Sequence, residues 1–389
     1  MAEIHCRHFN GYKPCGKNLE CDRSKCASFQ SIGARVLIVH LEALGAVLRS
    51  TALLAAIRRK YKRAHITWVT KSPAQALLQN LVSVDRVLTT SPQDLLKLSA
   101  LTFDVALVID KSLEAAGVLK STNAQEIFGF KADPVVGAIV PANSEAIELW
   151  ELGLSDEKKF FKNKKSEQQL VHEALRLGPF TRDPYQIQLS EAERDLSQER
   201  RQRWVGPSGV LLGLNTGSSA VLPFKKLSVE GHRRLIEGLL GDERFAGVGL
   251  VLLGGPEDTE RNEAIVRGLP VKVSPTELGL RDGLASVEAC DLVFSGDSLG
   301  MHMAIALQKW VVAWFGPTCP QEIDLYDRGV KVISSATCSP CWKRVCEQKV
   351  MCYDQVDFKQ VNQALAQGLT WLTSSSKQLF PETSFSPFL

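Results

Sequence analysis

The sequence predicts an α/β protein made of two domains, each built around a parallel β-sheet. Short continuous runs of apolar residues, typical of strands buried on both faces of a parallel sheet, alternate along the chain with segments of helical periodicity. The length of 389 residues also fits two domains of ordinary size, each able to bury its own core.

The apolar runs and the periodicity place the elements in order. A strand over residues 35–39 is followed by Gly45 and a helix over residues 46–61. Further strands are predicted over residues 65–70, 103–109, 210–215, 248–253, 292–295 and 310–315. The pattern fades in a polar stretch with prolines at its edges, so we place a domain boundary near residues 184–207. This predicts a Cys-rich segment 1–30, a first domain 31–190, a second domain 191–373 and a mobile tail 374–389.

Charge and hydropathy exclude several classes of protein. The chain has 46 Lys and Arg against 43 Asp and Glu, a net charge of +3, which excludes a dedicated basic nucleic-acid binder. Its longest apolar runs are far shorter than the roughly 18 residues of a membrane helix. The N-terminus has no signal-peptide core. We therefore expect a cytoplasmic protein.

The most informative segment is residues 291–318, in which an apolar strand ends in SGDSLG and a helix begins near Met301. Small residues at such a turn let backbone N–H groups approach a ligand, and a helix N-terminus favours an anion. The alternative is an ordinary glycine-rich turn in which Asp297 caps the helix.

Four ordered motifs together resemble the ADP-heptose:lipopolysaccharide heptosyltransferases, glycosyltransferase family nine. They are RVLIVHLEALGAVL from residue 35, VLLGGPE from residue 251, SGDSLGMHMAIAL followed by VVAWFGPT, and CSPCWKRVC from residue 338. The resemblance covers residues 32–370. Leu299 takes the place of a motif glycine, and Gly300 follows one position later.

The resemblance implies a GT-B architecture, with two Rossmann-like domains facing a cleft and the donor held mainly by the second domain. It implies catalysis without a metal cofactor, because a lysine, backbone donors and a helix dipole stabilise the leaving nucleoside diphosphate. Lys225 matches the family's phosphate-binding lysine, although sequence alone does not decide between Lys225 and Lys226. The implied donor-binding residues are Thr216, Gly217, Lys225, Gly254, Gly255, Pro256, Glu257, Gly296, Asp297, Ser298, Leu299, Gly300 and His302.

The sequence departs from the family where a catalytic base is expected. The family's first turn reads Gly-Asp, and that aspartate is its presumed base, whereas this chain has Gly45-Ala46. Two other carboxylates are candidates. Asp110 closes the strand FDVALVI and is preferred, because the carboxyl end of a parallel strand faces the ligand crevice. Its alternative role is to cap the following helix from Ser112. Glu42 lies in the first loop, where a surface position is the simpler interpretation.

Eight of the ten cysteines form two groups of four near the chain ends. Four thiolates suit a structural zinc or iron, and a closed site of this kind leaves no position for substrate. Only the second group contains a C-x-x-C pair, and the two groups together could share one site. The alternative is free or redox-labile thiols. The groups are Cys6, Cys15, Cys21 and Cys26, and Cys338, Cys341, Cys346 and Cys352.

We therefore expect an inverting glycosyltransferase that moves a heptose or similar sugar from an ADP-sugar to the lipopolysaccharide inner core. A protein acceptor, as in an O-heptosyltransferase, is an alternative, because some relatives modify proteins. Ala46 supports another hypothesis, a catalytically inactive nucleotide-sugar binder or scaffold; a redox-active iron–sulfur protein is a third. The lysine-rich segment 158–165 suggests peripheral contact with the inner face of the inner membrane, with a solvated loop as the alternative. No nucleic-acid partner is expected.

Overall fold

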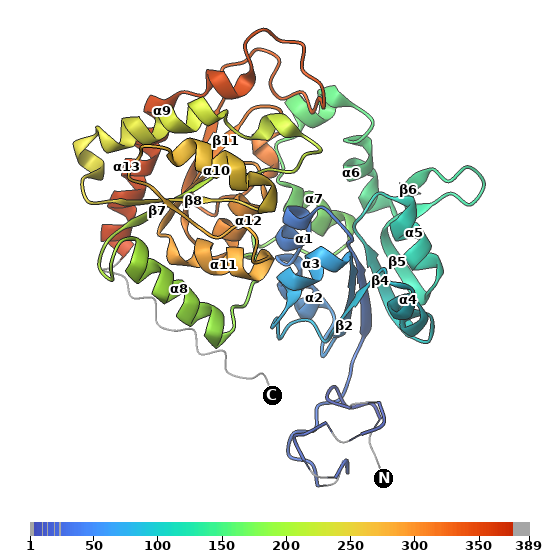
Figure 1. Ribbon diagram of the computed structural model, residues 1–389. Helices are drawn as coiled ribbons and strands as arrows, with labels where there is room; N and C mark the ends of the chain where they lie inside the picture. Colours follow the sequence, from blue (N-terminus) through green and yellow to red (C-terminus); the bar gives the residue numbers. More distant parts are fainter. Residues whose placement is uncertain (1–3, 10, 14, 19, 23–24, 376–389) are drawn as a thin grey trace. The chain divides into compact units, whose positions relative to one another are not determined.

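In the computed structural model the chain forms two compact units, of which the first ends at Gln188 and the second begins at Leu189 (Figure 1). The structure describes residues 4–9, 11–13, 15–18, 20–22 and 25–375. The last helix continues to Ser375, so the first two residues of the predicted mobile tail are helical. The rest of that tail, residues 376–389, lies outside the described residues.

The first unit contains a six-stranded sheet in the order β3-β2-β1-β4-β5-β6. Neighbouring strands are parallel except β5 and β6, which are antiparallel. Residues 36–39 at the centre of the sheet are almost inaccessible to solvent, as the continuous apolar run predicts. The strands are β1 (Arg35–Val39), β2 (His65–Thr70), β3 (Arg86–Thr89), β4 (Thr102–Val108), β5 (Asn123–Ala132) and β6 (Ile139–Pro141).

The predicted helix over residues 46–61 is two helices, which is a correction. Thr51 interrupts it, because its hydroxyl donates to the carbonyl of Leu48 at 2.6 Å and accepts the N–H of Gln186 at 2.8 Å. The α-helices of this unit are α1 (Leu44–Ser50), α2 (Leu53–Lys60), α3 (Ser72–Gln75), α4 (Pro92–Ser99), α5 (Leu113–Lys120), α6 (Ile147–Glu151) and α7 (Glu167–Ala174). Short turns of other helix types are η1 (Ala76–Leu78), η2 (Ser144–Ala146) and η3 (Lys158–Lys162).

The second unit repeats this topology in an all-parallel sheet of order β12-β11-β10-β7-β8-β9. Counted within each unit, both sheets follow the Rossmann order 3-2-1-4-5-6. The strands are β7 (Leu211–Asn215), β8 (Gly249–Leu253), β9 (Lys272–Val273), β10 (Leu292–Gly296), β11 (Trp310–Phe315) and β12 (Gly329–Ile333). The predicted strands differ from these by at most one residue at either end, and those not predicted, such as β3 and β12, lack a continuous buried run.

Helices surround this second sheet (Figure 1). They are α8 (Glu191–Trp204), α9 (Val229–Leu240), α10 (Thr259–Val266), α11 (Leu280–Ala289), α12 (Leu299–Ala306) and α13 (Phe358–Ser375). Short 3-10 turns are η4 (Pro223–Lys225), η5 (Glu243–Phe245), η6 (Pro256–Asp258), η7 (Pro320–Glu322) and η8 (Cys352–Gln355).

Apolar cores fill the space between sheet and helices in each unit. In the first unit, alternate residues of β1 face two different cores, with Val36 and Ile38 in one and Leu37 and Val39 in the other. This is why the strand reads as an uninterrupted apolar run. In the described part of the chain, no helix combines the length and the apolar character needed to cross a membrane.

Helix α8 occupies the polar stretch in which no helix was predicted. Few of its residues are apolar, but its start carries a capping box: Ser190 Oγ accepts the N–H of Glu193, and Glu193 Oε2 accepts the N–H of Ser190 at 2.7 Å. Arg281 of α11 donates to Glu193 Oε1 at 2.7 Å. The hydrogen bond from Arg281 and the backbone bond from Ser190 lower the pKa of Glu193 to about 2.

We expect Glu193→Ala to lower the free energy of unfolding by about 1–2 kcal/mol at pH 7, because the variant loses the Glu193 half of the capping box and the Arg281 contact. Since the carboxyl pKa is depressed in the folded state, this contribution is present above the unfolded pKa near 4.5 and is lost as pH falls towards 2. Urea titrations at several pH values measure it. Glu191→Ala, at an exposed position in the same first turn, is the control and should have little effect. An equal loss in both variants at pH 7 would contradict the assignment.

Candidate functional site

The carboxyl ends of β7, β8, β10 and β11 meet at one edge of the second sheet because these strands are parallel. The donor-binding residues predicted from the resemblance lie in the loops at this edge or at the start of α12, except Gly296, which is the last residue of β10. The loops contain Thr216, Gly217 and Lys225 after β7, Gly254, Gly255, Pro256 and Glu257 after β8, and Asp297 and Ser298 after β10, with Leu299, Gly300 and His302 in α12.

The turn between β10 and α12 is organised by Ser298. Its hydroxyl accepts the backbone N–H of Met301 and thereby caps α12. The amide nitrogen of Asn215, the last residue of β7, lies 3.0 Å from the same hydroxyl. The interpretation of Asp297 as the helix cap is therefore wrong, because Ser298 occupies the N-cap position.

Two glycines in this region are required by close neighbours. A Cβ on Gly300 would lie 2.5 Å from Asn215 Oδ1, so the glycine next to the helix start is needed at 300 and not at 299. A Cβ on Gly296 would lie 2.0 Å from the carbonyl oxygen of Lys225. The backbone of Lys225 therefore packs directly against the end of β10.

Three charged or titratable side chains of the predicted set come together here. Lys225 Nζ lies 3.7 Å from Asp297 Oδ2, and His302 Nε2 lies 3.9 Å from Asp297 Oδ1. All three side chains are largely buried. A lysine beside the N-terminus of α12 is a suitable arrangement for binding a phosphate group.

Two hydroxyl groups at this edge were not predicted as site residues. Ser218, in the loop after β7, and Thr318, in the FGPT turn after β11, are buried, and their hydroxyl oxygens have no hydrogen-bond partner within the described structure. Buried hydroxyls usually have a partner, which makes these two additional candidates for ligand contacts.

A buried carboxylate, Asp258, underlies the loop after β8. Its Oδ2 accepts the N–H of Gly255 at 3.1 Å, and its Oδ1 lies 3.6 Å from Lys226 Nζ. A Cβ on Gly217 would lie 2.1 Å from Asp258 Oδ2, so this glycine is required. Lys225 and Lys226 therefore both turn inward, towards different aspartates. Asp258 was not predicted as a site residue, although it directly follows the GGPE motif.

Thr216 supports this loop from inside the protein. Its hydroxyl donates to the carbonyl of Leu253 at 3.0 Å and contacts the Asn262 amide at 2.5 Å. Because the side chain is completely buried, it positions the loop through these contacts.

In the first unit, Asp110 lies at the carboxyl end of β4, next to the loop after β1. Its Oδ2 accepts the backbone N–H of Leu41 in that loop. Helix α5 is capped by Ser112, whose hydroxyl accepts the N–H of Ala115 at 3.2 Å. The alternative role of Asp110 as a helix cap is therefore wrong.

Burial changes the titration of Asp110 and of the neighbouring His40. Burial raises the pKa of Asp110 to about 6, against the opposing effect of the Leu41 hydrogen bond. Burial and the nearby Arg49 lower the pKa of His40 to about 3, so this histidine is neutral near pH 7. His40 Nε2 lies 3.9 Å from Asp110 Oδ1, and its Nδ1 lies 2.7 Å from Ser50 Oγ. Because His40 is neutral near pH 7, it does not form an ion pair with Asp110.

The other candidate base, Glu42, is exposed. Its carboxylate pairs with Lys71 at 3.0 Å. Ala46, where the family's aspartate is expected, lies in the first helix, α1.

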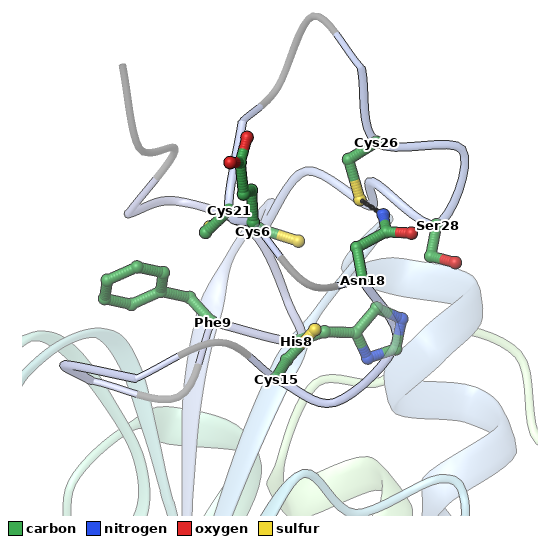
Figure 2. A pocket seen from close by; sticks show the side chains of 9 residues that line it. Cys6, His8, Phe9, Cys15, Asn18, Cys21, Cys26 and Ser28 are labelled. Carbon is green, nitrogen blue, oxygen red and sulfur yellow. Dashed lines mark hydrogen bonds between the residues drawn. The ribbon is translucent and has the colours of Figure 1, made fainter.

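The four N-terminal cysteines line one pocket, together with His8 and Asn18 (Figure 2). The Asn18 amide donates to the sulfur of Cys26 at 2.8 Å. The segment is attached to the first unit by Arg7, whose Nε lies 2.5 Å from Asp85 Oδ1.

The four C-terminal cysteines line a separate pocket, with walls formed by Phe224, Gly316 and Pro317. Burial and the three neighbouring cysteines raise the pKa of the Cys352 thiol to about 11. Each cysteine group therefore lines a pocket within its own unit.

Within the described residues, no disulfide joins any of the ten cysteines. In the part of the chain that the structure describes, no three cysteine, histidine or carboxylate side chains already surround a point where a metal would sit. The donor set of each pocket nevertheless fits zinc or iron in its chemistry, since four soft sulfur donors line one space. Coordination would require these side chains to turn further inward.

Comparisons with known proteins agree with this architecture. The signature of Glycosyltransferase family 9 (heptosyltransferase) matches residues 96–352. A solved family 9 glycosyl transferase from Veillonella parvula is 17% identical, with a TM-score of 0.67 over 87% of this chain and 98% of that one. A search of curated proteins finds no match.

Two heptosyltransferases of Escherichia coli share the fold. ADP-heptose lps heptosyltransferase II is 17% identical, with a TM-score of 0.59 over 88% of this chain and 99% of that one. The iron-containing dodecameric glycosyltransferase TibC is 10% identical, with a TM-score of 0.53 over 88% and 77%. A further TibC structure holds ADP-D-β-D-heptose.

The likeness confirms the predicted GT-B architecture of two Rossmann-like units. The family signature covers well over half of the chain. This protein therefore belongs to glycosyltransferase family 9, the heptosyltransferases, and is a glycosyltransferase.

Proposed function

We propose that the protein transfers a heptose from an ADP-sugar to the inner core of lipopolysaccharide, with inversion and without a catalytic metal. The observation that carries this proposal is the grouping of Lys225, Asp297 and His302 beside the N-terminus of α12. Within this grouping, the Lys225 ammonium and the helix N-terminus suit the diphosphate of a nucleotide sugar. The ADP-heptose complex of TibC supports the choice of donor.

In the proposed reaction, the two units have different tasks. In the first unit, the Asp110 carboxylate accepts the proton of the acceptor hydroxyl. The acceptor oxygen then forms a bond to the anomeric carbon as the bond from that carbon to the diphosphate oxygen breaks. In the second unit, Lys225 and the backbone N–H groups of α12 stabilise the negative charge on the departing ADP.

The lysine-rich segment does not contribute to this proposal. Lys158 pairs with Glu151, and Lys165 pairs with Glu148 and Glu173, within the same unit. These lysines are therefore partly neutralised, and the acceptor contact does not depend on their binding an anionic membrane surface.

The function is tested by measuring ADP release from ADP-heptose with and without lipopolysaccharide core. We expect release that depends on the acceptor and that falls by at least about 100-fold in Asp110→Asn, the usual size of a general-base effect. Glu42→Gln removes the exposed alternative carboxylate and is the control, with activity near that of the unmodified protein. If Glu42→Gln loses the activity and Asp110→Asn retains it, the assignment of the base is wrong.

The same assay separates the enzyme from an inactive binder. ADP-heptose binding without release, across lipopolysaccharide and protein acceptors, would favour the binder, with Ala46 as its cause. Turnover gained only after Ala46→Asp would support that conclusion.

The pH profile provides an independent check on Asp110. Because the carboxyl pKa is raised to about 6, the group is protonated below pH 6 and can no longer accept a proton. We expect kcat/KM to fall about tenfold for each pH unit below 6 and to level off above it. Asp110→Asn should show no such step in its residual rate. A step that persists in the variant would assign the titration to another group.

We also propose that both cysteine groups hold structural metal ions, zinc or iron. The presence of four cysteines in the lining of each pocket supports this, and the iron-containing relative TibC makes iron a candidate for this chain. Four-sulfur ligation leaves no open position, so the role is structural and not catalytic.

Elemental analysis of the purified protein tests the metal sites. We expect about two metal ions per chain, falling to about one in Cys15→Ser and to about one in Cys341→Ser, because each substitution removes one ligand of four. Absorbance in the visible range distinguishes iron from colourless zinc. Cys290→Ala, in a buried thiol outside both pockets, is the control and should retain both ions. Metal-free protein after purification with zinc and iron supplied would overturn this proposal.

A further inference from the structure

The C-terminal cysteine pocket shares a wall with the candidate donor site. Phe224 lines the pocket and is followed directly by Lys225, the lysine facing Asp297. Both residues belong to the short turn η4, which contacts η8, the turn that begins at Cys352. The thiol of Cys352 points to the carbonyl of Phe224 at 4.0 Å.

A second wall of the pocket is the turn after β11, which lies at the same edge of the sheet as the donor site. A Cβ on Gly316 would lie 2.8 Å from the sulfur of Cys352, so the cysteine packs directly on this turn. The N–H groups of Cys341 and Trp342 both donate to the carbonyl of Pro317, at 3.1 and 2.9 Å. The cysteine segment therefore holds residues 316–317 through its backbone.

The Cys352 end of the pocket is tied to the sheet. The hydroxyl of Ser334, immediately after β12, donates to the carbonyl of Cys352 at 2.6 Å. The backbone N–H of Ser334 donates to the carbonyl of Phe315 at 2.8 Å. Cys352 thus has a fixed position relative to β11 and β12.

The loop that carries Lys225 is anchored unevenly. Residues 219–221 before it are exposed, whereas Leu222 is buried. On one side, the carbonyl of Lys225 packs on Gly296, and on the other side, Phe224 faces the cysteines. The cysteine pocket is therefore one of the supports of this loop, in addition to the end of β10.

We infer that the C-terminal cysteine pocket positions Lys225 for the donor diphosphate, so that closure of the four thiolates around one metal ion raises the affinity for ADP. The inference rests on the proposed function, in which Lys225 contacts the diphosphate. The cysteines and Phe224 act as positioning residues, since they reach the donor only through the Lys225 loop and the turn after β11.

The test is the dissociation constant of ADP measured by calorimetry on the full chain, with metal content measured in the same samples. The double variant Cys338→Ser, Cys341→Ser leaves Cys352 and the lysine in place but removes two ligands. We expect it to lose the C-terminal metal and to bind ADP about tenfold more weakly, a common size for coupling between two sites. Cys290→Ala is the matched control, with unchanged ADP affinity.

A coupling measurement shows whether the effect passes through the lysine. Lys225→Met should weaken ADP binding by itself, and the cysteine double variant should then cause little further loss in this background. Thermal unfolding identifies a variant that fails to fold. If the cysteine double variant fails to fold, Phe224→Ala replaces it in the test. Phe224→Ala keeps all four cysteines, so we expect it to retain the metal while binding ADP several-fold more weakly.

The outcomes separate this inference from the proposed function. Equal ADP affinity with and without the C-terminal metal would overturn the inference and leave the transferase proposal intact. Absence of a C-terminal metal, or a full additional loss in the Lys225→Met background, would also overturn it. ADP binding that is undetectable even in the metal-loaded protein would count against the proposed function itself.

Discussion

The parallel pairing of β10 with β7 is the constraint on which the candidate donor site depends. It sets Phe294 beside Leu214, so the two strands end side by side and their loops share one edge. Asn215 then joins the two ends through the hydroxyls of Ser295 and Ser298. This junction fixes where α12 begins, and the glycine at 300 leaves room for the Asn215 side chain. Without the pairing, Lys225 and the helix N-terminus would not face the same space.

The pairing of β1 with β4 has the corresponding effect in the first unit. It places the end of β4 next to the loop that follows β1, where Leu41 donates its N–H to Asp110. In the proposed mechanism, a carboxylate that follows the neighbouring strand thus takes the role of the family's aspartate, whose position in helix α1 is held by Ala46. Burial there keeps the pKa of Asp110 near 6, which is closer to neutrality than that of an exposed aspartate.

The cysteine groups are local in sequence, but the fold adds distant residues to the pocket of one of them. Both groups are short in sequence, and each collects its four thiols in one pocket. The C-terminal pocket, however, is completed by Phe224 and by the turn after β11, which are distant from it in the chain. The proposed link between this pocket and the donor site therefore depends on contacts that no spacing of cysteines indicates.

The sequence by itself determined the central strands, the family and most of the loops that carry the site. Buried parallel strands are recognised as continuous apolar runs. Motifs such as SGDSLG and GGPE contain the small residues that their turns need. It did not reveal helix α8, which has too few apolar residues for a helical spacing of apolar positions to be recognised. Nor did it reveal the break at Thr51. Only the tertiary structure decided that Asn215 contacts the Ser298 hydroxyl, that Asp258 lies buried opposite Lys226, and that Asp110 binds the loop after β1. The reason is physical: these are contacts between loops of different strands, and the strand order brings them together across many residues of sequence.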